Sequence, residues 1–250
     1  MRRRRICRIA VVLFCLVGVL PASLARADML TGTPALTGAT TIYSGGTSQS
    51  VLVTPMNVTN LTTGQTLLAF CGDFTVSTSP AFGSSTGQAY GAHALFSPTL
   101  TIYSELQKSQ VNDLFSYAYA TAFDYQGNVT NVTNARAFQL TLWELLTETD
   151  PMLDILTGNF RASVSGAIAT TTNAWLGVLA GASTWDLLGL TAMAYDDLTV
   201  YVADGGVHAS QTLISITCPP PPPVVPEPAT MLIFGIGAVA AAPFLRRRKT

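Results

Sequence analysis

The chain has 250 residues, 48% of them hydrophobic and 11% charged, so it can bury a substantial core and is not disordered over most of its length. Its net charge of −1 hides an asymmetry: ten of the 13 Lys and Arg residues lie before Asp28 or after Leu245, and the stretch 28–225 carries three cations against 13 carboxylates. Three cations cannot neutralise a row of phosphates, which excludes nucleic-acid binding.

Residues 1–27 are typical of a secretory signal peptide. An arginine-rich start is followed by the apolar run Ile9–Leu20 and by the small residues of Ala25-Arg26-Ala27. The run is shorter than the roughly 20 residues that a membrane span needs. We therefore expect signal peptidase to cleave before Asp28.

The stretch 28–217 predicts a single domain of the α+β class, with a sheet or sandwich portion and an inserted layer of three helices. Alternating or β-branched runs predict strands at 40–43, 51–54, 66–70, 198–202 and 211–217. A capping box at Ser104 and apolar residues at helical spacing predict a helix that begins there. Two further helices are expected at 134–147 and 160–180.

Signatures of catalysis are few. The chain has two histidines, His93 and His208, which stand far apart, and it has neither a phosphate-binding glycine loop nor a Gly-x-Ser-x-Gly motif. We therefore expect no cofactor, no metal and no turnover enzyme.

Two cysteines remain in the exported chain, Cys71 and Cys218, because Cys7 and Cys15 leave with the signal peptide. In an oxidising compartment they can form a disulfide. The loop closed would have about 150 residues and would stabilise the fold by about 4–5 kcal/mol in the chain-entropy model. Two free thiols are the other simple interpretation.

The C-terminal end combines a stiff spacer with a membrane segment. Residues 218–225 include five consecutive prolines, which favour polyproline II and predict a stalk. Residues 226–250 hold the triplet Pro226-Glu227-Pro228, an apolar run expected to form a transmembrane helix, and the cluster Arg246, Arg247, Arg248 and Lys249. These cations would keep the end of the chain in the cytoplasm.

This arrangement resembles the PEP-CTERM sorting signal of Gram-negative bacteria. The resemblance implies recognition by an exosortase, cleavage near the Pro-Glu-Pro triplet, and delivery to the cell surface or the extracellular matrix. Before processing, the tail would anchor the protein in the membrane. A plain C-terminal membrane anchor is the alternative and has the same topology.

Two segments of the domain, Phe70-Cys71-Gly72-Asp73 and Phe138-Gln139-Leu140-Thr141-Leu142-Trp143, resemble the Cys-Gln thioester domains of bacterial surface adhesins. The resemblance implies an internal bond from the Cys71 sulfur to the side-chain carbonyl of Gln139. Trp143 would lie one helical turn from Gln139 and exclude water. Asp73 would position the cysteine strand or accept a proton.

The chemistry needs these residue types because a thiolate is a strong nucleophile and an amide carbonyl reacts only when it is held in fixed alignment. An amine on a surface or matrix molecule could then take the acyl group from the thioester. The sequence thus predicts an exported attachment protein that reacts once. The alternative is a non-catalytic matrix or binding scaffold with a Cys71–Cys218 disulfide or free thiols.

Overall fold

The computed structural model describes residues 27–75, 80–148, 153–180, 198–204 and 210–216. The predicted signal peptide, proline stalk, sorting tail and Cys218 lie outside these residues. Within them, no helix is both long enough and apolar enough to span a membrane.

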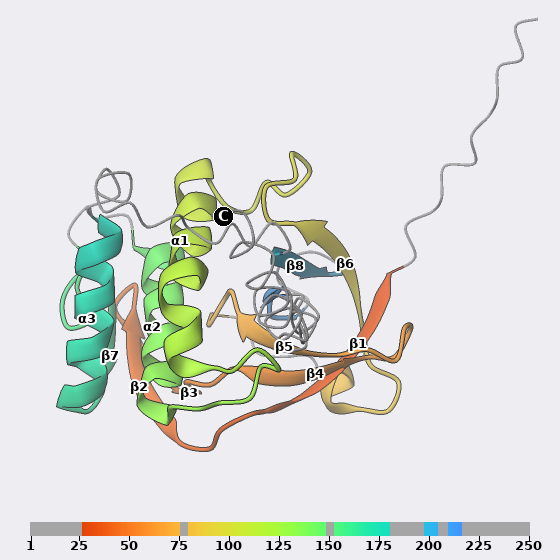
Figure 1. The fold of residues 1–250 in the computed structure, drawn as a ribbon, viewed down its shortest axis with the longest axis horizontal. Helices are drawn as coiled ribbons and strands as arrows, with labels where there is room; N and C mark the ends of the chain where they lie inside the picture. The colour runs from red at the N-terminus through yellow and green to blue at the C-terminus, as the bar shows by residue number, and fades with distance from the viewer. Residues whose placement is uncertain (1–26, 76–79, 149–152, 181–197, 205–209, 217–250) are drawn as a thin grey trace, which may run out of the picture.

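Six antiparallel strands close into a barrel, on the right in Figure 1. Going round the barrel, each strand pairs with the next in the order β1-β4-β5-β9-β8-β6. Their bounds are β1 Asp28–Pro34, β4 Met56–Asn60, β5 Thr66–Cys71, β6 Gln88–Ala94, β8 Leu198–Ala203 and β9 Leu213–Ile216.

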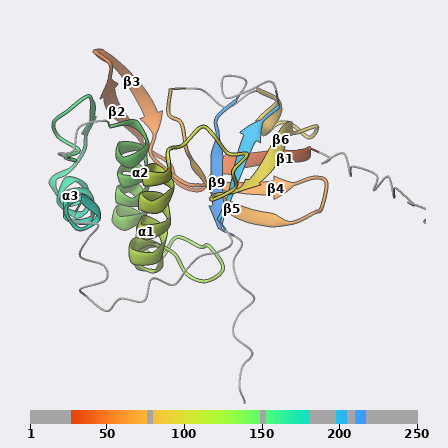
Figure 2. The same cartoon turned by 90° about the horizontal axis from the view of Figure 1, so that it is seen from above.

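Three helices stand beside the barrel, and a second sheet lies alongside the helices (Figure 2). The helices are α1 Glu105–Ala122, α2 Val132–Thr147 and α3 Gly166–Ala180, with α2 packed against both of the others. The second sheet has the order β3-β2-β7 and consists of β2 Ala39–Ser44, β3 Thr47–Leu52 and β7 Phe160–Ser163. A short 3₁₀ helix, η1, spans Pro80–Gly83.

The α+β class is confirmed, and the helices are inserted between barrel strands β6 and β8, as expected. The sequence indicated only a sheet or sandwich portion. The structure has a closed barrel and a separate three-stranded sheet. The capping box of α1 is also confirmed: Ser104 Oγ accepts from the Gln107 N–H at 3.2 Å, and Gln107 Oε1 accepts from the Ser104 N–H at 2.9 Å.

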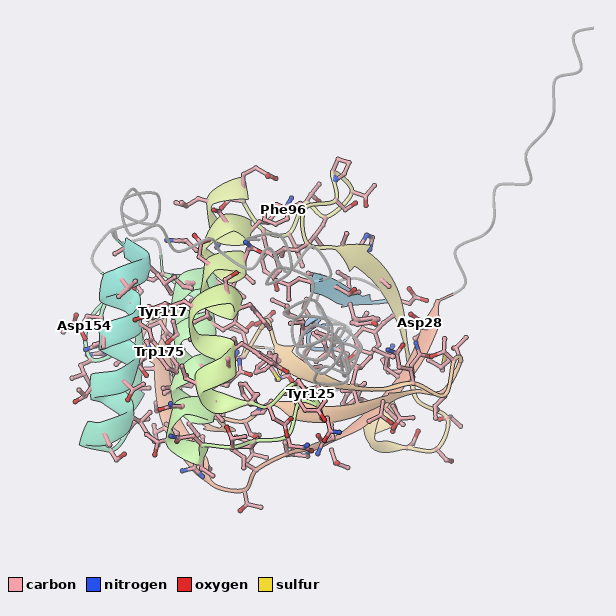
Figure 3. The ribbon with its side chains drawn as sticks, in the orientation of Figure 1. Asp28, Phe96, Tyr117, Tyr125, Asp154 and Trp175 are labelled. Carbon is pink, nitrogen blue, oxygen red and sulfur yellow. The ribbon has the colours of Figure 1, made fainter. Side chains whose placement is uncertain are left out.

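The helix predicted at 160–180 is wrong over its first residues. Phe160–Ser163 forms β7 and pairs with β2, and α3 begins only at Gly166. Phe160 and Ala162 are buried while their neighbours are exposed, so this segment has the alternation of a strand. Trp175, which lies on α3, is buried (Figure 3).

Candidate functional site

Cys71 is the last residue of β5 and is held between two aromatic clusters. Phe70, just before it, packs edge-on against Phe115 and Phe123, with ring centroids 5.3 Å apart in both pairs. Phe74, just after it, packs against Trp143 at 5.6 Å and Phe160 at 4.9 Å. Large buried rings on both sides fix the path of the chain through Cys71.

The backbone of Cys71 pairs with a side chain where a strand would otherwise continue. The neighbouring strand β4 pairs with β5 only as far as Met56 opposite Ala69, so it does not reach Cys71. Gln139 on α2 takes its place: its Oε1 accepts from the Cys71 N–H at 3.2 Å and its Nε2 donates to the Cys71 carbonyl at 2.8 Å. These two bonds imitate one pair of an antiparallel ladder.

Trp143 adds a second donor to the same carbonyl. Its Nε1 donates to the Cys71 oxygen at 2.8 Å, and the side chain is 1% exposed. Gln139 and Trp143 lie one turn apart on α2, so a single helix face holds the Cys71 backbone. The predicted proximity of Cys71, Gln139 and Trp143 is therefore found.

The sulfur itself contacts a residue that the sequence analysis did not single out. Cys71 Sγ donates to Gln211 Oε1 at 3.0 Å. The register explains this contact: Cys71 pairs with Leu213 of β9, and Gly72 donates to the Thr212 carbonyl at 2.8 Å. Gln211 is thus the diagonal neighbour of Cys71 across two antiparallel strands, within reach of a long side chain.

The thiol is buried and stays protonated at neutral pH. Burial, reinforced by the negative charge of Asp73, raises the pKa of Cys71 to about 12. Asp73 closes a turn after β5, where its Oδ1 accepts from the N–H and the hydroxyl of Thr75 at 2.7 and 2.6 Å. The charge of Asp73 opposes ionisation of the thiol.

Gly72 allows a close approach beside the thiol. A Cβ at this position would overlap the hydroxyl of Tyr103, whose Oη donates to the Gly72 carbonyl at 3.5 Å. A larger residue would therefore have to displace the half-buried ring of Tyr103. The short Phe70-Cys71-Gly72-Asp73 segment thus has a packing reason for its glycine.

A cavity of about 350 Å³ lies beside Cys71 and Gln211. Cys71, Gln211 and Trp143 line it together with residues 49–52 of β3. None of the 14 described residues that line it is charged. The space is large enough for a small molecule or a side chain to approach the Cys71–Gln211 contact.

Other parts of the predicted chemistry fall outside this site. Cys218 and the sorting tail are not among the described residues, and within those residues Cys71 forms no disulfide. Across the same residues, no three His, Cys, Asp or Glu side chains are grouped as metal ligands.

Comparison with known proteins gives two kinds of match. The fold resembles the N-terminal thioester domain of the fibronectin-binding protein SfbI from Streptococcus pyogenes, with 15% identity and a TM-score of 0.45 over 78% of this chain and 95% of that one. It also resembles the N-terminal thioester domain of a surface protein from Clostridium perfringens, with 14% identity and a TM-score of 0.39 over 72% and 98%.

No curated protein matches the chain. Residues 224–249 match the model of the PEP-CTERM protein-sorting motif. This range contains the Pro226-Glu227-Pro228 triplet and the cations up to Lys249, on which the sequence prediction depended. The chain therefore carries a PEP-CTERM sorting motif.

Proposed function

We propose that this protein is an exported surface attachment protein in which Cys71 and Gln211 form an internal thioester. The observation that carries the proposal is the 3.0 Å contact between the Cys71 sulfur and the Gln211 side-chain oxygen, at the edge of a cavity. A nucleophile and an acyl group held this close react as if at very high concentration.

The reaction conserves atoms without an oxidant. The sulfur attacks Cδ of Gln211, the bond from Cδ to Nε2 breaks, and ammonia leaves with the thiol proton. Because the pKa of the thiol is about 12, a free thiolate is scarce at neutral pH. The hydrogen bond from Sγ to Oε1 supports a route in which the proton passes directly to the amide that is being cleaved.

Gln139 was the acyl donor expected from the sequence, and its environment favours a different role. Both polar atoms of its carboxamide are already bonded to the Cys71 backbone. We therefore assign Gln139 and Trp143 as positioning residues that hold the Cys71 carbonyl, and Gln211 as the acyl donor.

The thioester would react with an amine on a surface or matrix molecule. The amine attacks the acyl carbon, the carbon–sulfur bond breaks, and the proton of the amine goes to sulfur, which leaves an amide and a free thiol. Since the acyl group is consumed, the protein acts once and is not a turnover enzyme. The PEP-CTERM motif supports export past signal peptidase and processing by an exosortase, with the tail in the membrane until then.

Intact mass of the purified domain, residues 28–217, tests the proposal. We expect the wild type to be lighter than its sequence by one ammonia and to gain one methylamine on incubation. Cys71→Ala and Gln211→Ala should each abolish both changes, while Gln139→Leu should reduce the yield of thioester. Peptide mapping should link Cys71 to the segment that contains Gln211.

The same measurement separates the alternatives. A link from Cys71 to Gln139 would reverse the assignment of the two glutamines. In the chain extended to Cys218, loss of two hydrogens that a reductant restores would instead establish the Cys71–Cys218 disulfide. An unmodified mass that methylamine leaves unchanged would refute the thioester and favour a passive scaffold.

A further inference from the structure

Among the described residues, strand β3 is an unpaired edge strand of the three-stranded sheet. It is six residues long, Thr-Ser-Gln-Ser-Val-Leu, and contains neither a charge nor a proline. The opposite edge strand, β7, has four residues and carries Arg161, which lies over the ring of Tyr43. Natural edges are usually short or protected by charge, so an exposed, uncharged edge marks a place for another strand.

The hairpin geometry identifies the free backbone groups of β3. Gly45 and Gly46, both at positive φ, form a two-residue turn between Ser44 and Thr47. In such hairpins the closing pair is hydrogen-bonded, and alternate residues then point their N–H and C=O outward. Those residues are Ser48, Ser50 and Leu52, and within the described ranges their backbone groups form no backbone hydrogen bond outside the ladder.

Strand β3 also lines the cavity beside Cys71 and Gln211. Gln49 through Leu52 line the cavity that also contains Cys71 and Gln211. The Gln49 side chain reaches across it, and its Nε2 donates to the Phe74 carbonyl at 3.0 Å. A strand added to β3 would therefore run along the cavity mouth.

We propose that the partner docks as an extended segment on the free edge of β3 and inserts a lysine side chain into the cavity. The inference rests on the thioester proposed above and names its acceptor. Side chains of a strand alternate between faces, so one lysine can point at the Cys71–Gln211 atoms while its neighbours point away.

Charge and apolar surface favour this occupant. The stretch 28–225 carries three cations against 13 carboxylates, a field that attracts a cationic segment. Leu52, 45% exposed at the end of the edge, offers an apolar contact to a neighbouring side chain of the docked strand. The long aliphatic stem of lysine suits a cavity without charged residues.

The test uses a capped synthetic peptide of alternating Thr and Val with one central Lys. Docking is measured by fluorescence anisotropy on the Cys71→Ala domain, where no covalent bond can form. Ser50→Pro in that background removes an outward N–H and leaves the β2–β3 ladder intact, since edge strands tolerate proline. Ser50→Ala is the matched control, because it removes the hydroxyl and keeps the N–H.

We expect Ser50→Pro to weaken peptide binding about tenfold or more and Ser50→Ala to change it little. A peptide N-methylated at alternate residues, added to the protein with Ser50 intact, should lose affinity to a similar degree. This second comparison decides the question even if the proline variant misfolds. Equal affinity for the methylated and unmethylated peptides would overturn the proposal.

In the reactive protein, Ser48→Pro changes an outward-pointing residue of β3 that is not among the residues lining the cavity. It should slow coupling to the lysine peptide and leave the addition of methylamine unchanged, since methylamine needs no strand. Equal slowing of both reactions would show damage to the thioester and overturn a separate docking role. If methylamine never adds, the thioester fails, and the anisotropy measurement on Cys71→Ala still tests the docking edge by itself.

Discussion

Gln139 acts in place of a strand, which makes its two hydrogen bonds important for stability. Without it, the N–H of Cys71 would be buried and unpaired, while the carbonyl would keep its bond from Trp143. We expect Gln139→Leu, measured in a Cys71→Ala background, to lower the free energy of unfolding by about 2 kcal/mol or more.

Urea unfolding checks this expectation, with Thr141→Val as the control on the same buried helix. Among the described residues, the Thr141 hydroxyl donates to the Ala137 carbonyl alone, so its loss should cost within about 1 kcal/mol. Equal destabilisation by the two variants would mean that Gln139 is an ordinary buried amide.

Glu144, one residue after Trp143 on α2, is a buried acid that lowers stability at neutral pH. Its Oε1 accepts from the Asp154 N–H at 3.1 Å, while Oε2 has no hydrogen-bond partner among the described residues. Burial, together with the charges of Glu148 and Asp154, raises the pKa of Glu144 to about 8 against the Asp154 hydrogen bond that lowers it. Asp154 lies beside α3 in Figure 3.

The sign of the effect follows from linkage. The folded state keeps the proton of Glu144 up to about pH 8, whereas the unfolded chain releases it near the ordinary pKa of 4.5. Stability from this group is therefore lost as pH rises from about 4.5 to 8. We expect Glu144→Gln, which imitates the protonated form, to raise Tm increasingly over that range and to have little effect at the acid end.

Thermal unfolding at a series of pH values measures the difference, with Glu105→Gln as a control. Glu105 is 80% exposed and pairs only with Lys108 at the start of α1. If the melting curves of the wild type and Glu144→Gln shift in parallel with pH, the buried acid has no such role.

At the level of elements, the sequence predicts best what local chemistry determines. The start of α1 follows from the four-residue segment 104–107, in which Ser104 and Gln107 form the capping bonds with each other. α2 begins two residues earlier than expected, because Asn131 caps it and accepts from the Asn134 N–H. Strands β2, β5 and β8 were also predicted, since their β-branched and apolar residues form short runs.

The error at β7 has a different origin. Phe160, Val164 and Ile168 stand four residues apart, a spacing typical of one helix face. The same residues are compatible with the observed strand followed by a helix. The deciding contact is remote: β2, more than 100 residues earlier, offers an edge on which Phe160–Ser163 can pair. Tertiary pairing of this kind overrides local preference, and the alternation of only four residues is too short to predict it.

The candidate site shows the same division. The Cys71 and Gln139 segments could be associated through their resemblance to thioester domains, and they do meet. Gln211 could not be singled out, because its position beside the sulfur depends on the register between β5 and β9, 140 residues apart in the chain. A predicted strand at 211–217 indicated a sheet partner but not which strand it would join.

For the whole molecule, the charges that would attract a cationic partner lie apart from the cavity in which the proposed reaction takes place. The acidic residues are spread over the domain, whereas the cavity is lined without charge. A cationic partner should thus be drawn to the surface by the overall field and then react in a neutral site. Salt should weaken the first step and leave the second unchanged.

We therefore expect the second-order rate of coupling to the lysine peptide to fall several-fold as NaCl rises from about 10 mM to about 500 mM, over which the Debye length shrinks from about 30 Å to a few ångströms. Hydroxylamine, which is uncharged at neutral pH, should open the thioester at the same rate throughout. Both rates are measured as the rate of loss of the thioester, monitored by intact mass. If both reagents show the same salt dependence, salt acts on the site itself, and the acidic surface has no part in recruiting the partner.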